Sequence, residues 1–189
     1  MDTNTEQDIH QKGFDKGYKW LHWSMAALIL LMFFALIGFA EGITTQERME
    51  MLVGHSSLGT IISVLLIARV FKRFIKKDAQ PVQMINKWQL LVSKAVQMGL
   101  YACMIIVPLS GYLSARFHEL PVMVFGSFNI NQGSQIAYDM ETFLSFRNIH
   151  EGAISVLMAL LVLHIGAAIY HKLVKKDSVL ASMTRFKKA

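Results

Sequence analysis

The chain has 189 residues, enough for one domain, and 53% of them are hydrophobic while only 17% carry a charge. This composition, with a mean hydropathy of +0.39, excludes an ordinary soluble domain and favours a chain that lies in a bilayer. The formal net charge is +6, and the single cysteine, Cys103, excludes an internal disulfide and a Cys-ligated iron–sulfur cluster.

Four segments are apolar over the length of about 20 residues that a helix needs to cross the hydrocarbon core. In chain order they cover residues 20–40, 51–71, 91–115 and 149–173. All four are expected to be helices, because only a helix satisfies its own backbone hydrogen bonds in lipid. The predicted fold is an all-α integral membrane protein with a four-transmembrane-helix bundle.

The segments outside the bundle are an N-terminal tail of residues 1–19 and a basic C-terminal tail of residues 174–189. The first span is expected to be retained rather than cleaved as a signal peptide, because its polar leader is long and no convincing small-residue cleavage site follows.

The basic residues predict the orientation of the chain. All but three of the 19 Lys and Arg residues lie in the two tails or around the connection between the second and third spans. The exceptions are Arg48, Arg116 and Arg147. By the positive-inside rule, both termini are expected on the cytoplasmic side of a bacterial inner membrane. The excess charge therefore indicates topology and contact with anionic lipid, not nucleic-acid binding.

Five of the seven histidines fall inside the spans: His22, His55, His150, His164 and His171. Ionisable side chains in a span are costly and usually functional. His150 and His164 are fourteen residues apart, which in a helix is a rise of about 21 Å and a rotation within about 40° of four whole turns. Their imidazoles are therefore expected on one side of the fourth span, at two depths.

The directions of the spans supply a partner at each depth. The first span runs outward, so His22 lies near the inner surface with His164; the second runs inward, so His55 lies near the outer surface with His150. An imidazole on each side is an axial ligation that a b-type haem accepts. We therefore expect two b-type haems, held by His22/His164 and by His55/His150.

Other interpretations of these histidines stay open. A single histidine in a span is more often a hydrogen-bonded packing residue than a ligand. Zinc or copper would need ligands that converge on one point, whereas the two pairs are separated by about 21 Å. A haem-free transporter or proton channel with a histidine relay is the alternative function, and a b-type absorption spectrum would exclude it.

Several fragments together resemble the bacterial cytochrome b561 family. They are LHW at 21–23, GHSSLG at 54–59, ARVFKR at 68–73, PLSGYL at 108–113, and NIHEG…LHIGAAIYHKLVKKDSVLASM at 148–183. The resemblance extends from about residue 14 to residue 186. It implies a four-helix bundle, two b haems with bis-histidine ligation from the first, second and fourth spans, and electron exchange with the quinone pool.

Two arginines are candidates for contacts with haem propionates. Arg69 follows His55 by fourteen residues and so shares its face at the inner depth, where it either pairs with a propionate or extends to the lipid headgroups. Arg116 lies at the outer side, in a long connection of residues 116–147 that is expected to cap the outer haem.

A quinone site is expected at the cytoplasmic end, where His171 and Lys87 offer titratable donors near the His22–His164 level. His171 is alternatively the inner ligand in place of His164, or an interfacial anchor. The predicted function is electron transfer between the quinone pool and a periplasmic-side donor or acceptor, with superoxide as one candidate donor. Service as the membrane anchor of a larger oxidoreductase is a further alternative.

Overall fold

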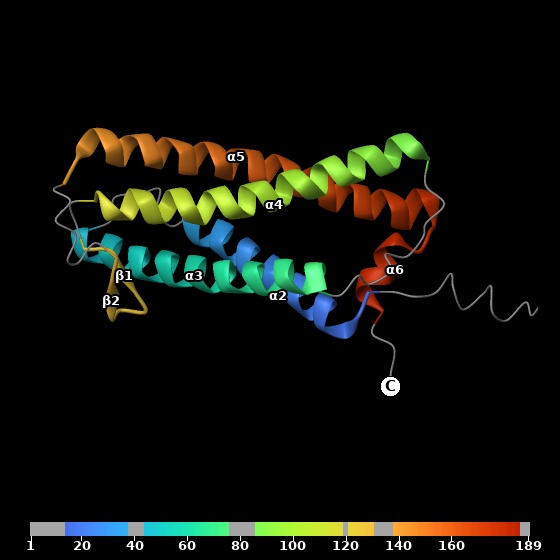
Figure 1. The fold of residues 1–189 in the computed structure, drawn as a ribbon, viewed down its shortest axis with the longest axis horizontal. Coiled ribbons are helices and arrows are strands. Elements are labelled where there is room, and N and C mark those ends of the chain that lie inside the picture. Colours follow the sequence, from blue (N-terminus) through green and yellow to red (C-terminus); the bar gives the residue numbers. More distant parts are fainter. Residues whose placement is uncertain (1–13, 38–43, 76–85, 119–120, 131–137, 186–189) are drawn as a thin grey trace, which may run out of the picture.

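The computed structural model describes residues 14–37, 44–75, 86–118, 121–130 and 138–185. Its main elements are four long helices, each apolar and long enough to cross a membrane. They are α2 (Lys16–Ile37), α3 (Thr45–Ile75), α4 (Lys87–Arg116) and α5 (Met140–Tyr170). The predicted four-helix membrane fold is therefore confirmed, and Figure 1 shows the helices running side by side as an elongated bundle.

All four helices begin before the apolar spans that the sequence predicts, by four to nine residues. The Asn86 side chain accepts a hydrogen bond from the Trp88 amide at the start of α4, and the Asp139 side chain accepts one from the Glu141 amide at the start of α5. These caps satisfy amides that have no partner within the helix, and so extend the helix into polar sequence. Hydropathy locates the part of a helix that lies in lipid, whereas capping decides where the helix begins.

The bundle consists of two closely packed helix pairs. The backbone of α4 packs along α5 and that of α2 along α3, while α2 and α5 have little backbone contact in the described part of the chain. Few side chains are fully buried, Met25 among them, and large apolar side chains such as Phe34 and Val162 point outward. Outward apolar surface of this kind is what lipid covers in a membrane protein.

A short hairpin lies against α3 at the end of the bundle where α3 begins (Figure 1). Its strands, β1 (Met123–Val124) and β2 (Phe128–Asn129), are antiparallel, with Met123 opposite Asn129. The turn includes Phe125 at φ 53° and Gly126 at φ 67°. A left-handed backbone suits a glycine but is unusual for a bulky residue such as Phe125. The hairpin belongs to the connection of residues 116–147 in which the sequence predicts a cap.

The C-terminal region folds back toward α2. After α5, the π-helical turn η2 (His171–Lys175) and the short helix α6 (Val179–Thr184) follow. Trp23 Nε1 donates to the Met183 carbonyl at 3.0 Å, and Lys19 Nζ donates to the Arg185 carbonyl at 2.6 Å. The described part of the predicted C-terminal tail is therefore ordered, and it lies against the helix that carries His22.

Candidate functional site

The bundle brings four histidines together as two pairs. The ring centres of His22 on α2 and His164 on α5 are 6.3 Å apart, and those of His55 on α3 and His150 on α5 are 6.0 Å apart. The ring planes cross at 74° and 72°. Because α5 contributes to both pairs, they lie at two levels, which we call the His22 end and the His55 end.

The spacing within each pair fits two imidazoles that share one metal ion. An imidazole nitrogen lies about 2.0–2.1 Å from the metal that it binds, and roughly 1.1 Å from its ring centre, so two rings on opposite sides of a metal have centres about 6.3 Å apart. The observed separations match this value. No cluster of three or more His, Cys, Asp or Glu side chains that could hold a metal occurs among the described residues.

The ring of His150 is oriented by α4. Its Nδ1 donates to the Val107 carbonyl at 2.7 Å, which leaves Nε2 as the nitrogen with a free lone pair. A Cβ added at Gly111 would lie 2.9 Å from His150 Cε1, so only glycine lets α4 approach the ring this closely. A ligand histidine commonly donates its second ring proton to a backbone carbonyl in this way.

The ring of His22 has a different neighbour. Arg69 Nη1 lies 2.8 Å from His22 Nδ1, and because a guanidinium has only donors, Nδ1 accepts this hydrogen bond. In a neutral imidazole the proton is then on Nε2. Trp23 also packs edge-on against the ring, with centres 5.4 Å apart. The nearest polar neighbour of His22 is therefore a guanidinium, whereas that of His150 is a backbone carbonyl.

Two serines next to His55 hold the hairpin on α3. Ser56 Oγ donates to the Met123 carbonyl at 2.6 Å, and Ser57 Oγ accepts from the Phe125 amide at 2.8 Å. Val122 and Val124 are buried behind these bonds. The hairpin is thus anchored beside one of the two histidine pairs.

The remaining predicted site residues lie apart from the rings of the two pairs. Arg116 Nη1 donates to the Ile130 carbonyl at 3.3 Å and so holds the loop at the His55 end. Lys87 is exposed at the start of α4, and it makes no polar contact with His171 in the described structure. The side chain of His171 is 15% exposed.

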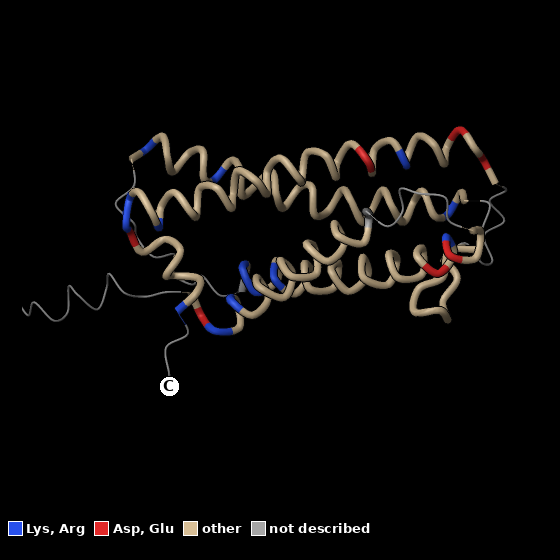
Figure 2. Tube along the Cα trace, turned by 180° about the vertical axis from the view of Figure 1, so that it is seen from behind, with Lys and Arg blue, Asp and Glu red and all other residues tan. Residues whose placement is uncertain are grey.

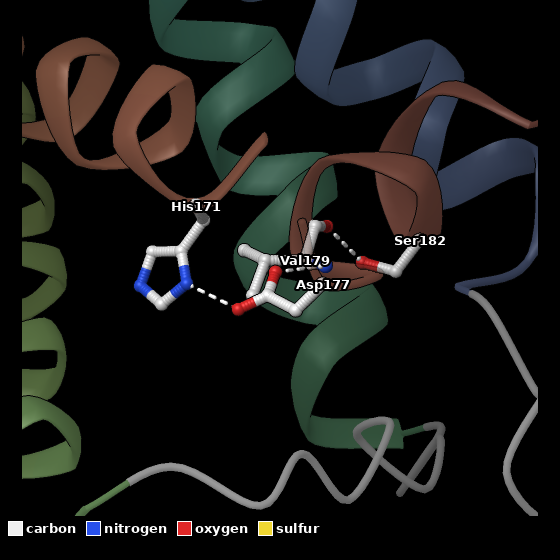
Figure 3. A network of polar contacts seen from close by, with 4 residues as sticks. All are labelled: His171, Asp177, Val179 and Ser182. Carbon is white, nitrogen blue, oxygen red and sulfur yellow. Dashed lines mark hydrogen bonds and ion pairs between the residues drawn. The ribbon is translucent and has the colours of Figure 1, made fainter. Parts of the chain in front are cut away.

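His171 forms an ion pair that joins α5 to α6. Its Nδ1 donates to Asp177 Oδ2 at 2.6 Å, and Asp177 Oδ1 accepts from the Val179 amide at 3.0 Å (Figure 3). Ser182 Oγ donates to the Val179 carbonyl at 2.7 Å. Figure 3 shows the imidazole directed at the carboxylate that also caps the start of α6. This imidazole–carboxylate contact lies at the His22 end.

Charge divides the two ends of the molecule (Figure 2). The described basic residues at the His55 end are Arg48, Arg116 and Arg147, and all other described lysines and arginines lie toward the His22 end. The acidic residues Glu47, Glu50, Asp139, Glu141 and Glu151 gather at the His55 end.

Comparison with known proteins identifies the family of the chain. A profile of the family described as "Prokaryotic cytochrome b561" matches residues 13–186, nearly the whole chain. The chain belongs to the prokaryotic cytochrome b561 family. Similar relatives are two Escherichia coli (strain K12) proteins. "Cytochrome b561 homolog 1" is 24% identical over 173 residues, which are 90% of this chain and 96% of that protein. "Cytochrome b561 homolog 2" is 26% identical over 129 residues, 68% of each chain.

Membership in the cytochrome b561 family supports a haem-containing b-type cytochrome that takes part in electron transfer. The predicted family, the membrane-spanning helices and the general electron-transfer role are therefore confirmed.

Several residues at the two pairs were not assigned a role by sequence reasoning. They are Val107, Ser110 and Gly111 at His150, and Ser56 and Ser57 beside His55. All of them except Val107, which precedes PLSGYL, fall in the fragments PLSGYL and GHSSLG, which carry part of the family resemblance. The signal in the sequence was Gly111, a glycine among larger residues in a helix. Such a glycine usually marks a place where a neighbouring helix comes close.

Proposed function

We propose that this b561 cytochrome binds two haem b groups, one between His22 and His164 and one between His55 and His150. The observation that carries the proposal is the pair of ring separations, 6.3 Å and 6.0 Å, built on one shared helix. A bound haem supplies one-electron oxidation and reduction at its iron.

The chain's own residues support such sites in three ways. The Val107 carbonyl accepts a hydrogen bond from His150 Nδ1, which leaves the lone pair of Nε2 for a metal. Gly111 lets α4 pack against the imidazole. The backbones of α2 and α5 have little contact in the described part of the chain, as a planar group between them would require.

We further propose that the His22 end lies on the cytoplasmic side of the inner membrane. The gathering of lysines and arginines at this end supports the orientation, because positively charged segments are retained on the cytoplasmic side. Arg69 at the His22 end and Arg116 at the His55 end would pair with haem carboxylates.

The proposed redox partners are the quinone pool and a donor or acceptor on the periplasmic side, with superoxide as a candidate donor. Reduction of a quinone takes up protons as well as electrons. The His171–Asp177 pair lies at the cytoplasmic end, where it could exchange protons with water, and Lys87 would supply a further donor. We therefore place the quinone site at the His22 end.

The test of the two-haem proposal is a haem count on four variants. Wild-type protein is expected to give two haems per chain in a pyridine haemochrome assay. His22→Ala and His164→Ala should each lose one haem and leave the same residual spectrum, and His55→Ala and His150→Ala should leave the other.

One result would reassign the ligands and another would reject the function. If His171→Ala matches His22→Ala while His164→Ala keeps both haems, the ligand at the His22 end is His171. A colourless wild-type preparation from haem-replete cells would support a haem-free transporter or channel instead.

A further inference from the structure

Four side chains from three helices converge at the His22 end without forming part of either histidine pair. Arg69 and Arg73 lie one turn apart on α3, Tyr18 is on α2 and Tyr101 is on α4. The Arg69 Cζ is 4.9 Å from the Tyr18 ring centre and 5.7 Å from the Tyr101 ring centre. Arg73 Cζ is also 5.7 Å from the Tyr101 ring centre. The two tyrosine hydroxyls are 3.4 Å apart. We call this group the Arg69–Arg73 cluster.

The carboxylate in this region is already engaged. Asp15 pairs with Lys72 through both carboxylate oxygens, at 2.9 Å and 2.8 Å, and accepts the Tyr18 amide at 3.0 Å. Burial alone would raise the pKa of Asp15. The hydrogen bonds from Lys72 and the Tyr18 amide outweigh this effect and lower the pKa to about 2. Gly17 leaves space for the Lys72 ammonium, because a Cβ there would lie 2.6 Å from Nζ. Asp15 is thus a partner of Lys72 and not of the arginines.

The two guanidinium groups have no acidic partner in the described part of the chain. The hydrogen bond that Arg69 makes there is the one to His22 Nδ1, and its Nε is buried without an acceptor. A guanidinium has five N–H donors, and leaving a charged donor buried and unpaired is costly. Two like charges held beside one ring also repel each other. Both costs are removed if an anion binds between them.

We propose that the Arg69–Arg73 cluster is a binding site for an oxyanion, either a carboxylate or a phosphate group. Guanidinium groups bind such anions through paired N–H donors, and one of the two tyrosine hydroxyls, which share a hydrogen bond, supplies a further donor. Arg69 is partly buried near His22, whereas Arg73 is exposed next to Phe74, which is 78% exposed. The site therefore opens from the interior of the bundle toward lipid.

Two sources offer this chemistry, a haem propionate from the interior and a phospholipid headgroup from the membrane. The propionate source rests on the haem proposed between His22 and His164, while the lipid source does not. If His22 binds the haem iron through Nε2, its proton is on Nδ1. Nδ1 then cannot accept a hydrogen bond from Arg69. Haem binding would then release the Arg69 guanidinium for an anion.

The experiment compares Arg69→Gln/Arg73→Gln with the wild type as full-length protein in nanodiscs that contain phosphatidylglycerol. Three quantities are measured: the haem count, the propionate bending bands in the resonance Raman spectrum of the haems, and the phosphorus that stays bound per chain after exchange into detergent. Lys175→Gln is the matched control, because it removes an exposed positive charge at the same end. Arg73→Gln and Tyr101→Phe are single variants that spare His22 and are used if the double variant does not fold.

With a propionate in the site, the variants shift one propionate band and leave the bound phosphorus unchanged. With a lipid phosphate, they lose about one phosphorus per chain and leave the propionate bands unchanged. Either result supports the site, and Lys175→Gln should produce neither. If the folded variants match the wild type in both quantities, the oxyanion site is rejected. A wild type with two haems and unchanged variants rejects the site and the propionate contact of Arg69, but leaves the two proposed haem sites standing.

Discussion

The two histidine pairs have similar ring separations but different surroundings. At the His55 end, a backbone carbonyl from Val107 orients His150, and the ring rests against Gly111. At the His22 end, the nearest polar neighbour of His22 is the Arg69 guanidinium, with two tyrosines around it. A positive charge favours the reduced, less positive state of a nearby redox centre, and a carbonyl acceptor makes the ligand imidazole more basic. We expect the haem at the His22 end to have the higher potential.

The largest expected effect tests the close approach of α4 to His150. Gly111→Ala places a methyl group 2.9 Å from the imidazole, which the Val107 hydrogen bond prevents from moving aside. Overpacking of this kind costs about 1–3 kcal/mol, so we expect most of the haem at the His55 end to be lost and the other haem to remain. The haem count and the redox titration measure this.

The matched control is Gly99→Ala in the same helix. Its added Cβ would also lie 2.9 Å from a neighbour, but that neighbour is Cδ1 of Leu160, a flexible side chain. This variant should keep both haems. Equal haem loss in the two variants would mean that α4 packing in general, rather than the contact with His150, supports the site.

The next effect sharpens the assignment of quinone chemistry to one end. His171→Leu removes the imidazole that pairs with Asp177, and loss of a proton-transfer group typically slows a reaction by about 10²-fold or more. Both haems should stay bound, while stopped-flow oxidation by a soluble quinone becomes slower. His118→Leu, at the opposite end, should have little effect. The reverse ranking would move the quinone site to the His55 end.

A smaller effect concerns the hairpin beside His55. Ser56→Ala/Ser57→Ala removes two hydrogen bonds to the hairpin, each worth about 1 kcal/mol. Amide hydrogen exchange at residues 122–128 should accelerate, and the spectrum of the haem at the His55 end alone should change. Ser63→Ala is the control, since the hydrogen bond that Ser63 Oγ makes within the described residues is to the Gly59 carbonyl of its own helix. Unchanged exchange in the double variant would show that Val122 and Val124 suffice to hold the hairpin.

The smallest effect is the pH dependence of the Asp15–Lys72 pair. The pKa of Asp15 is lowered from 3.8 to about 2, so the pair contributes stability above pH 4 that is lost as the pH falls toward 2. The side chains are 28% and 24% exposed, and a screened pair of this kind contributes about 1 kcal/mol or less. Asp15→Asn should lower the thermal midpoint slightly at pH 7 and should not differ from the wild type near pH 2. A constant difference at both pH values would contradict the assignment.

The sequence predicts those features that depend on periodicity and composition. The spacing of His150 and His164 already indicates one helix face at two levels, and the distribution of lysine and arginine separates the two ends. The contacts of Val107, Gly111, Ser56 and Ser57 could not be predicted this way, because each depends on how two helices or a helix and a hairpin approach each other. The same holds for α6, whose position follows from its contacts with Trp23 and Lys19.

Helix α5 gives one histidine to each pair, and it is the last long helix of the chain. This order has a consequence for biosynthesis. While the ribosome makes α2, α3 and α4, His22 and His55 are the members of the two pairs that have been synthesised. They lie on different helices, so neither pair exists yet. Both pairs are completed when α5 enters the membrane beside α4. A chain that stops before Met140 would therefore contain neither pair, and haem binding at either of the two proposed sites would have to follow translation of α5.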